Sequence, residues 1–238
     1  MAEQPQWGNP HVATPWIVGI TCFGLCGLLT GAVPGSGRVP WELTVASGWG
    51  PQIQVSAFAV IAPLILCAVI GLVFGIIHLR RGETMPGILA MIFGPLIGGL
   101  WALLFLLNLV LPHFGPQGLV SAGPLAGTGA TYPLLAGNPL LEGWLWLAVS
   151  LCLLVMAIAL GRISWQPCVM IFLSAVIFFL IALWSFAGAP EPLTSGLAQA
   201  AGWLILLFGV WIIYFGAVGL INETFARPIL PMGGPIFK

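Results

Sequence analysis

The amino-acid sequence predicts an all-α integral membrane protein, a bundle of six transmembrane helices. Hydrophobic residues make up 60% of the chain and charged residues only 5%, and the mean hydropathy is +1.10. A soluble domain of this size needs a charged, hydrated surface, which six basic and six acidic residues cannot provide. The hydrophobic residues also lie in long continuous runs. We therefore expect most of the chain to be surrounded by lipid.

The hydrophobic runs have the length of helical membrane crossings, which take about 20 apolar residues each. A run such as Leu204–Phe215 is continuous, whereas the strands of a membrane barrel alternate apolar and polar residues over about ten positions. A helix also pairs its backbone groups within one segment, as the lipid interior requires. The predicted crossings are Trp16–Val33, Val55–Leu79, Gly87–Leu111, Gly143–Leu160, Cys168–Ala187 and Gly196–Leu220.

The basic residues predict the orientation of this bundle. Six crossings place both termini on one side of the membrane, and that side carries Arg80, Arg81, Arg162, Arg227 and Lys238. The other side carries only Arg38. Because basic residues favour the cytoplasmic face, we expect cytoplasmic segments at residues 1–15 and 223–238, with the six-helix domain at residues 16–222. The expected location is the plasma (inner) membrane.

Motifs for catalysis are missing from the sequence. It has no G-x-S-x-G nucleophile motif, no phosphate-binding P-loop and no dinucleotide fingerprint. No C-x-x-C metal motif occurs, and the five cysteines are expected to act as packing residues. So few basic residues leave no patch for nucleic acid. We expect no enzymatic activity, no cofactor, no metal site and no nucleic-acid partner.

The predicted spans also lack ionisable residues near their centres. A charge inside the membrane is costly and by default functional, so this absence argues against a buried proton relay or a strong ion-coupling site. The polar residues that remain are mostly Ser and Thr, whose hydroxyls can bond to the helix backbone. Such a bundle suits a small solute that is cheap to desolvate. A short monocarboxylic acid, urea, ammonia and water all fit this description.

Glycine and proline mark the second and third spans. The pairs Gly71–Gly75 and Gly94–Gly98 have the small-residue spacing that allows close contact between membrane helices. Gly94-Pro95 interrupts the third span and frees backbone polar groups, which is tolerated where the backbone is buried or lines a cavity. Both a solute pathway and a passive kink remain open at this site.

The C-terminal segment Asn222–Gly233 resembles the N-E-x-[FY]-G-R-x-[VI]-L-P-x-G tail of the acetate uptake transporter family. The segment from Arg81 to Gly94 is similar to that family's K-G-N-T-F-G-x-T-A-F-x-S-Y-G motif, and Phe186-Ala187-Gly188 matches a third anchor. The chain is identified as a divergent member, because the Y-G-G-x-x-Q motif of the second span is lost. The matching motif positions are Asn9, Pro10, Gly82, Thr84, Gly87, Gly94, Asn222, Glu223, Arg227, Pro231 and Gly233.

The resemblance implies a ring of six subunits, each with six spans and its own solute path. It implies an apolar constriction formed by the first, third and fifth spans. By position, Phe93 replaces the family tyrosine on the third span, and Ser174 falls at the constriction on the fifth. The first span contributes Thr21 or Phe23. For Asn222 and Glu223, helix capping with subunit packing and contact with substrate are both open.

The expected function is therefore a membrane transporter or channel for small monocarboxylates such as acetate, assembled as a homohexamer. One alternative keeps the fold and conducts a neutral solute such as urea or ammonia. Another is a non-transporting accessory subunit of a larger membrane complex.

Overall fold

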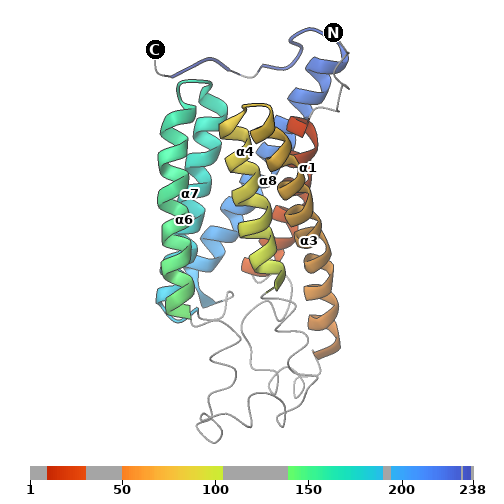
Figure 1. The fold of residues 1–238 in the computed structure, drawn as a ribbon. Coiled ribbons are helices and arrows are strands. Elements are labelled where there is room, and N and C mark those ends of the chain that lie inside the picture. Colours follow the sequence, from red (N-terminus) through yellow and green to blue (C-terminus); the bar gives the residue numbers. More distant parts are fainter. Residues whose placement is uncertain (1–9, 31–49, 104–138, 190–193, 232, 237–238) are drawn as a thin grey trace, which may run out of the picture.

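The computed structural model describes residues 10–30, 50–103, 139–189, 194–231 and 233–236 (Figure 1). Within these residues the regular elements are all helices, which confirms the predicted all-α bundle. The helices are α1 (Pro10–Leu29), α3 (Gly50–Arg80), α4 (Thr84–Met91), the π-helix η1 (Ile92–Gly99), α6 (Pro139–Leu160), α7 (Trp165–Phe186) and α8 (Gly196–Thr224). Helices α4 and η1 follow one another without a break, and the helical segment continues to Leu103.

Several of these helices have the dimensions of membrane crossings, so the chain is a multi-pass membrane protein. Five segments are long and apolar enough to span a bilayer: Ile61–Arg80, Thr84–Leu103, Leu140–Leu160, Trp165–Phe186 and Gly196–Thr224. The apolar stretch of α1, Thr14–Gly27, is shorter. Helix α1 begins at Pro10 rather than Trp16, and α8 continues past Leu220. The predicted span ends at Val33 and Leu111 lie outside the described residues.

The helices pack as antiparallel pairs. In two of these pairs, glycines allow the partner helices to approach each other closely. In the first pair, α1 lies against α8. A Cβ atom on Gly216 would meet Trp16, and one on Gly202 would meet Thr30, so the start of α1 lies beside the last turns of α8. In the second pair, α3 lies against α4 and η1. Here a Cβ on Gly71 would lie only 2.5 Å from the Cα of Gly94.

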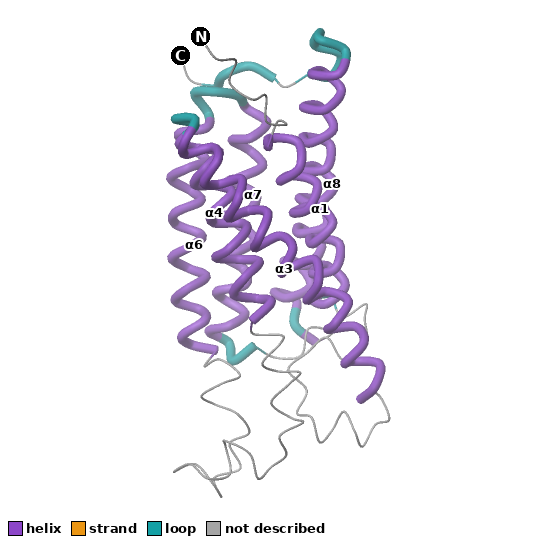
Figure 2. The backbone as a smooth tube through the Cα atoms, turned by 45° about the vertical axis from the view of Figure 1, so that its right-hand side comes forward, coloured by secondary structure: helices purple, strands orange, loops and turns teal. Residues whose placement is uncertain are grey.

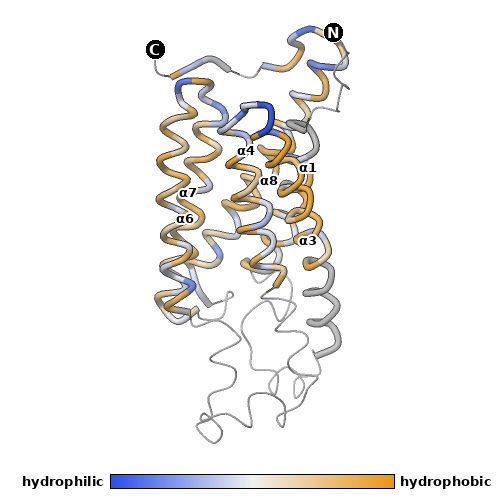
Figure 3. The backbone as a smooth tube through the Cα atoms, viewed as in Figure 1, coloured by the Kyte–Doolittle hydropathy of each residue, from blue (hydrophilic) through white to orange (hydrophobic). Residues whose placement is uncertain are grey.

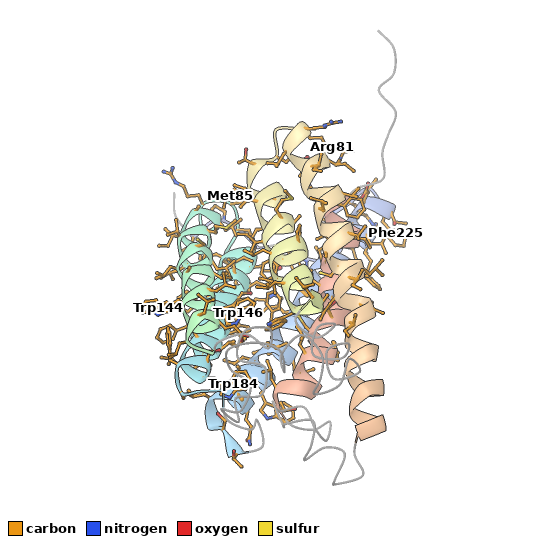
Figure 4. All side chains as sticks on the ribbon, turned by 60° about the horizontal axis from the view of Figure 1, so that its bottom comes forward. Arg81, Met85, Trp144, Trp146, Trp184 and Phe225 are labelled. Atoms are coloured by element: carbon orange, nitrogen blue, oxygen red, sulfur yellow. The ribbon has the colours of Figure 1, made fainter. Side chains whose placement is uncertain are left out.

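The third pair is the hairpin of α6 and α7. The Ser150 hydroxyl donates a hydrogen bond across it to the carbonyl of Ala175, at 2.7 Å. Two neighbouring tryptophans on α6 show which face is buried: Trp146 is 1% exposed, whereas Trp144 is 66% exposed. Figure 4 shows Trp146 toward the interior of the bundle and Trp144 on its outside. In a membrane, such exposed apolar side chains face lipid or another subunit.

One end of the bundle is hydrophilic. Arg80 ends α3, Arg81 lies in the turn between α3 and α4, and Arg162 lies in the turn between α6 and α7. Figure 3 shows hydrophobic colour along the helices and hydrophilic colour at the α3–α4 turn. The described tail after α8 lies at this same end (Figure 1). The basic residues that the structure describes, Arg80, Arg81, Arg162 and Arg227, thus lie at one end of the bundle.

Candidate functional site

A cavity of about 40 Å³ lies inside the single chain, between α1, α3, η1, α7 and α8. Helix α6 contributes no residue to the described lining and packs against α7. The lining residues are Val18, Thr21, Cys22, Leu25, Leu64, Cys67, Phe93, Ile97, Gly98, Trp101, Ser174, Ile177, Phe178, Ile205 and Phe208. A water molecule needs roughly 10–15 Å³ on such a scale, so this cavity has room for a solute of a few heavy atoms.

The π-helix forms one wall of this cavity, and Pro95 lies inside it. Proline has no backbone N–H and clashes with the carbonyl four residues earlier, which disfavours a regular α-helical turn at this position. The chain widens into π-helical turns instead. Phe93, Ile97 and Gly98 on these turns line the cavity. The irregular backbone predicted around Gly94-Pro95 therefore lies against the cavity, rather than at a remote kink.

Aromatic rings make up much of the wall. The rings of Phe93 on η1 and Phe208 on α8 are stacked, with centroids 5.7 Å apart and planes 18° from parallel. A second aromatic group joins Trp101 and Phe178, which line the cavity, to Trp146 behind them; its centroids are 5.3–6.3 Å apart. Such pairs prefer offset or tilted contacts, which hold the rings in place.

The two hydroxyl groups in the described lining each donate a hydrogen bond to a backbone carbonyl of their own helix. The Thr21 hydroxyl donates to the carbonyl of Ile17 at 2.8 Å, and the Ser174 hydroxyl donates to the carbonyl of Met170 at 3.2 Å. A hydroxyl has one hydrogen to donate, so in this arrangement neither group offers a donor to a solute. No charged side chain is among the lining residues in the part of the chain that the structure describes. The cavity thus presents an apolar, uncharged surface.

The structure brings together three of the four residues predicted for the pathway. Phe93, Ser174 and Thr21 all line the cavity, from η1, α7 and α1. Phe23 does not line it, and its side chain is 46% exposed on the outside of the bundle. Of the two alternatives on the first span, α1 therefore presents Thr21 to the cavity.

Sequence reasoning missed the contribution of α8. Ile205 and Phe208 line the cavity from this helix. Helix α8 is apolar on all sides, so its sequence holds no pattern that separates a lining side chain from a lipid-facing one. The cysteines on α1 and α3 were interpreted as packing residues, and Cys22 and Cys67 are indeed buried, but both also line the cavity.

None of the described residues of the family-like motifs is among the lining residues of the cavity. Asn9 is outside the described residues, and Pro10 and Thr84 are the first residues of α1 and α4. Gly82 has a φ of +76° in the turn that ends α3, where a side chain would be strained. Beside this turn, His78 Nδ1 and Glu83 Oε2 are paired at 2.5 Å. Gly87 and Gly94 pack against α3, and the remaining motif residues, Asn222, Glu223, Arg227, Pro231 and Gly233, belong to the end of α8 and the tail.

The side chain of Asn222 forms hydrogen bonds with the chain segment that follows α8. Its Oδ1 accepts hydrogen bonds from the N–H groups of Ile229 and Leu230, at 2.8 and 2.9 Å, and its Nδ2 donates to the carbonyl of Leu230 at 2.9 Å. Three of the side chain's hydrogen-bonding positions are thus taken up by the tail. In this position Asn222 shapes the tail and has no contact with the cavity.

Comparison with solved structures finds a neighbour described as the structure of the bacterial acetate channel SatP, with a TM-score of 0.60 and 19% sequence identity. The match covers 92% of this chain and 98% of that chain. No family model and no curated protein matches the sequence. At this identity the likeness concerns the fold. The resemblance to acetate uptake transporters, first indicated by Asn222–Gly233, is thereby confirmed at the level of the fold: the chain folds as that acetate channel does.

Proposed function

We propose that this protein is a membrane transporter or channel for small monocarboxylates such as acetate, and that the solute crosses within each subunit through the described cavity. The observation that carries the proposal is the small cavity lined by α1, α3, η1, α7 and α8 of one chain, whose described lining residues carry no charge. The shared fold with an acetate channel supports it. In this proposal Phe93 and Phe208 form the narrow part of the path, and Thr21 and Ser174 lie beside it.

The character of the cavity favours passage of the neutral acid. An isolated carboxylate pays a large desolvation cost in an apolar environment, and even an unpaired amide or hydroxyl costs about 2–7 kcal/mol. The hydroxyls of Thr21 and Ser174 donate to their own helices, so they do not compensate for this cost. A protonated monocarboxylic acid is uncharged and keeps one polar group to desolvate. We therefore propose that the solute loses its charge before it reaches the cavity.

The proposed setting is the plasma (inner) membrane, with residues 16–222 in the bilayer and residues 1–15 and 223–238 in the cytoplasm. Five of the six basic residues support this orientation through the positive-inside rule. We propose a homohexamer, in which subunits meet through exposed apolar residues such as Val69 and Val73 on α3. Size-exclusion chromatography with light scattering in mild detergent tests the assembly, and a monomer would contradict it.

Flux of labelled acetate into proteoliposomes at mildly acidic pH tests the function. Empty vesicles measure the simple diffusion of acetic acid. A variant that fills the cavity, Ile177→Trp, should reduce flux to the level of empty vesicles. Its control, Val169→Trp, adds the same ring to the exposed side of α7 and should leave flux unchanged. Wild-type flux no faster than that of empty vesicles would overturn the proposal.

A second candidate is conduction of a neutral solute such as urea or ammonia. It is favoured by the same engaged hydroxyls, because a site without a free donor or a charge has no group that selects a carboxyl. Stopped-flow swelling of proteoliposomes with urea, compared with acetate uptake in the same preparation, separates the two functions. Faster urea permeation with no acetate flux above empty vesicles would favour the second.

A further inference from the structure

The tail that follows α8 crosses the hydrophilic end of the bundle. Helix α8 ends at Thr224, and the chain then turns and runs toward the hairpin of α6 and α7 (Figure 2). We call residues 225–236 the strap; all of them except residue 232 are described. Hydrogen bonds hold the strap at two places, which we call its fastenings: one is on α8, and the other is on the α6–α7 hairpin.

The first fastening joins the strap to α8. Besides the three hydrogen bonds of Asn222, the Tyr214 hydroxyl donates to the carbonyl of Pro231 at 3.3 Å. Tyr214 lies more than two turns before the end of α8, so the strap folds back along the helix instead of extending beyond it.

The second fastening joins the strap to the hairpin. The Trp165 N–H donates to the carbonyl of Gly234, and the Ile236 N–H donates to the carbonyl of Gly161, both at 2.8 Å. The buried side chain of Gln166 adds a bond from Nε2 to the carbonyl of Pro231 at 3.0 Å. Trp165 is the first residue of α7, where an N–H has no partner within the helix. The strap therefore supplies an acceptor that α7 itself lacks.

Gly233 fits the strap against Trp165. Its φ is +77°, a conformation that L side chains rarely adopt, and a Cβ atom would lie 2.2 Å from Nε1 of Trp165. Gly234 has no atom within 4 Å of the position of its Cβ. The two adjacent glycines thus differ sharply. Gly233 is required by its contact with Trp165 and by its backbone conformation, whereas Gly234 is not.

These contacts join two helices that both contribute residues to the cavity lining. Helix α7 contributes Ser174, and α8 contributes Phe208. Ser174 lies nine residues beyond Trp165, which is about 14 Å along the helix. We propose that the strap fixes the start of α7 against α8 and so sets the separation of the α7 and α8 walls of the cavity. Pro231, with Gln166 on one side and Tyr214 on the other, is the point where the two helices are joined.

The functional consequence rests on the proposed function, because the strap controls solute passage only if this cavity is the path. Its effect on the cavity can be measured without transport. Cys22 and Cys67 are buried, free thiols in the lining, whereas Cys152 is exposed on the outside of α6. The rate at which the small neutral reagent methyl methanethiosulfonate labels the two cavity thiols reports how open the cavity is. Cys152 in the same molecule serves as the internal control.

The decisive comparison is Gly233→Ala against Gly234→Ala in the full chain in proteoliposomes. We expect Gly233→Ala to raise hydrogen exchange at the amides of Trp165 and Ile236. We also expect it to increase the labelling rate of Cys22 and Cys67 by about threefold or more, a change that needs only a small shift in free energy. Labelling of Cys152 should not change, and Gly234→Ala should behave as the wild type. If Gly233→Ala folds poorly, Asn222→Leu removes all three hydrogen bonds between Asn222 and the strap and should give the same changes.

Two results would overturn the proposal. In one, the amides of Trp165 and Ile236 exchange freely in Gly233→Ala while the cavity thiols keep their wild-type labelling rate, so a released strap leaves the cavity unaltered. In the other, those amides stay protected in both Gly233→Ala and Asn222→Leu, so neither the fit of Gly233 nor the bonds of Asn222 hold the strap in place. Acetate flux is recorded in parallel. An inactive wild type would reject the proposed function, whereas the labelling and exchange results would still decide the role of the strap.

Discussion

Phe93 and Phe208 stack within the cavity lining, with ring centroids 5.7 Å apart, although they come from η1 and α8. Both rings are buried. An aromatic pair of this kind contributes about 0.5–1.5 kcal/mol beyond the burial of its area. The pair thus links the irregular helix at Pro95 to α8, and either ring keeps the other in its place.

Removal of one ring should enlarge the cavity. We expect Phe93→Ala and Phe208→Ala each to raise the flux of butyrate relative to acetate by about fivefold, since an energy difference near 1 kcal/mol gives a change of this size. Each variant should also lose about 3 kcal/mol of stability, as large-to-small changes in a core do. Competitive flux of the two labelled acids in proteoliposomes measures the ratio.

Phe23→Ala is the matched control for this prediction, because it removes an exposed ring from α1. It should leave the flux ratio unchanged. Unaltered transport in a well-folded Phe93→Ala protein would remove Phe93 from the path.

Some features of the fold can be predicted from a short sequence segment, whereas others depend on residues that are far apart in the chain. The spans followed from continuous hydrophobic runs, and close packing at Gly71 and at Gly94 followed from small-residue spacing, both visible within short segments; that these two glycines meet each other did not follow. Phe93, Ser174 and Thr21 came from position in family-like motifs. By contrast, Phe208 lies on a helix that is apolar all round. The bond between Gln166 and Pro231 joins residues 65 positions apart, a pairing that only the folded chain specifies.

Gly94 should be intolerant of any side chain. A Cβ atom there would lie 2.6 Å from the Cα of Gly71, so α3 and η1 would have to separate. Overpacking of this kind costs about 1–3 kcal/mol. We expect Gly94→Ala to lower the melting temperature of the detergent-solubilised protein. Gly99→Ala on the same π-helix is the control, since its Cβ would meet Ala68 at an ordinary 3.5 Å. Equal melting temperatures for the two variants would contradict the close contact.

The hydroxyls in the lining should contribute little to solute binding. Thr21 and Ser174 donate to the carbonyls of Ile17 and Met170, so Thr21→Val and Ser174→Ala remove bonds within helices and not bonds to the solute. We expect the KM for acetate to change by less than about twofold, far below the tenfold that 1.4 kcal/mol would produce. Initial rates of uptake over a range of acetate concentrations give the KM. A tenfold rise in either variant would show that the hydroxyl turns from its carbonyl to bind the solute.

Transport should follow the neutral form of the acid. Because the lining carries no charge, at a fixed total concentration the protein-dependent flux of acetate should rise as the pH falls toward the pKa of acetic acid. Acetamide has nearly the same size and does not ionise in this range, so its flux should stay constant with pH. Both are measured as the difference between proteoliposomes and empty vesicles, which removes simple diffusion. An acetate flux that instead rises with pH, in parallel with the anion, would mean that charge is stabilised along the path by groups other than those lining this cavity.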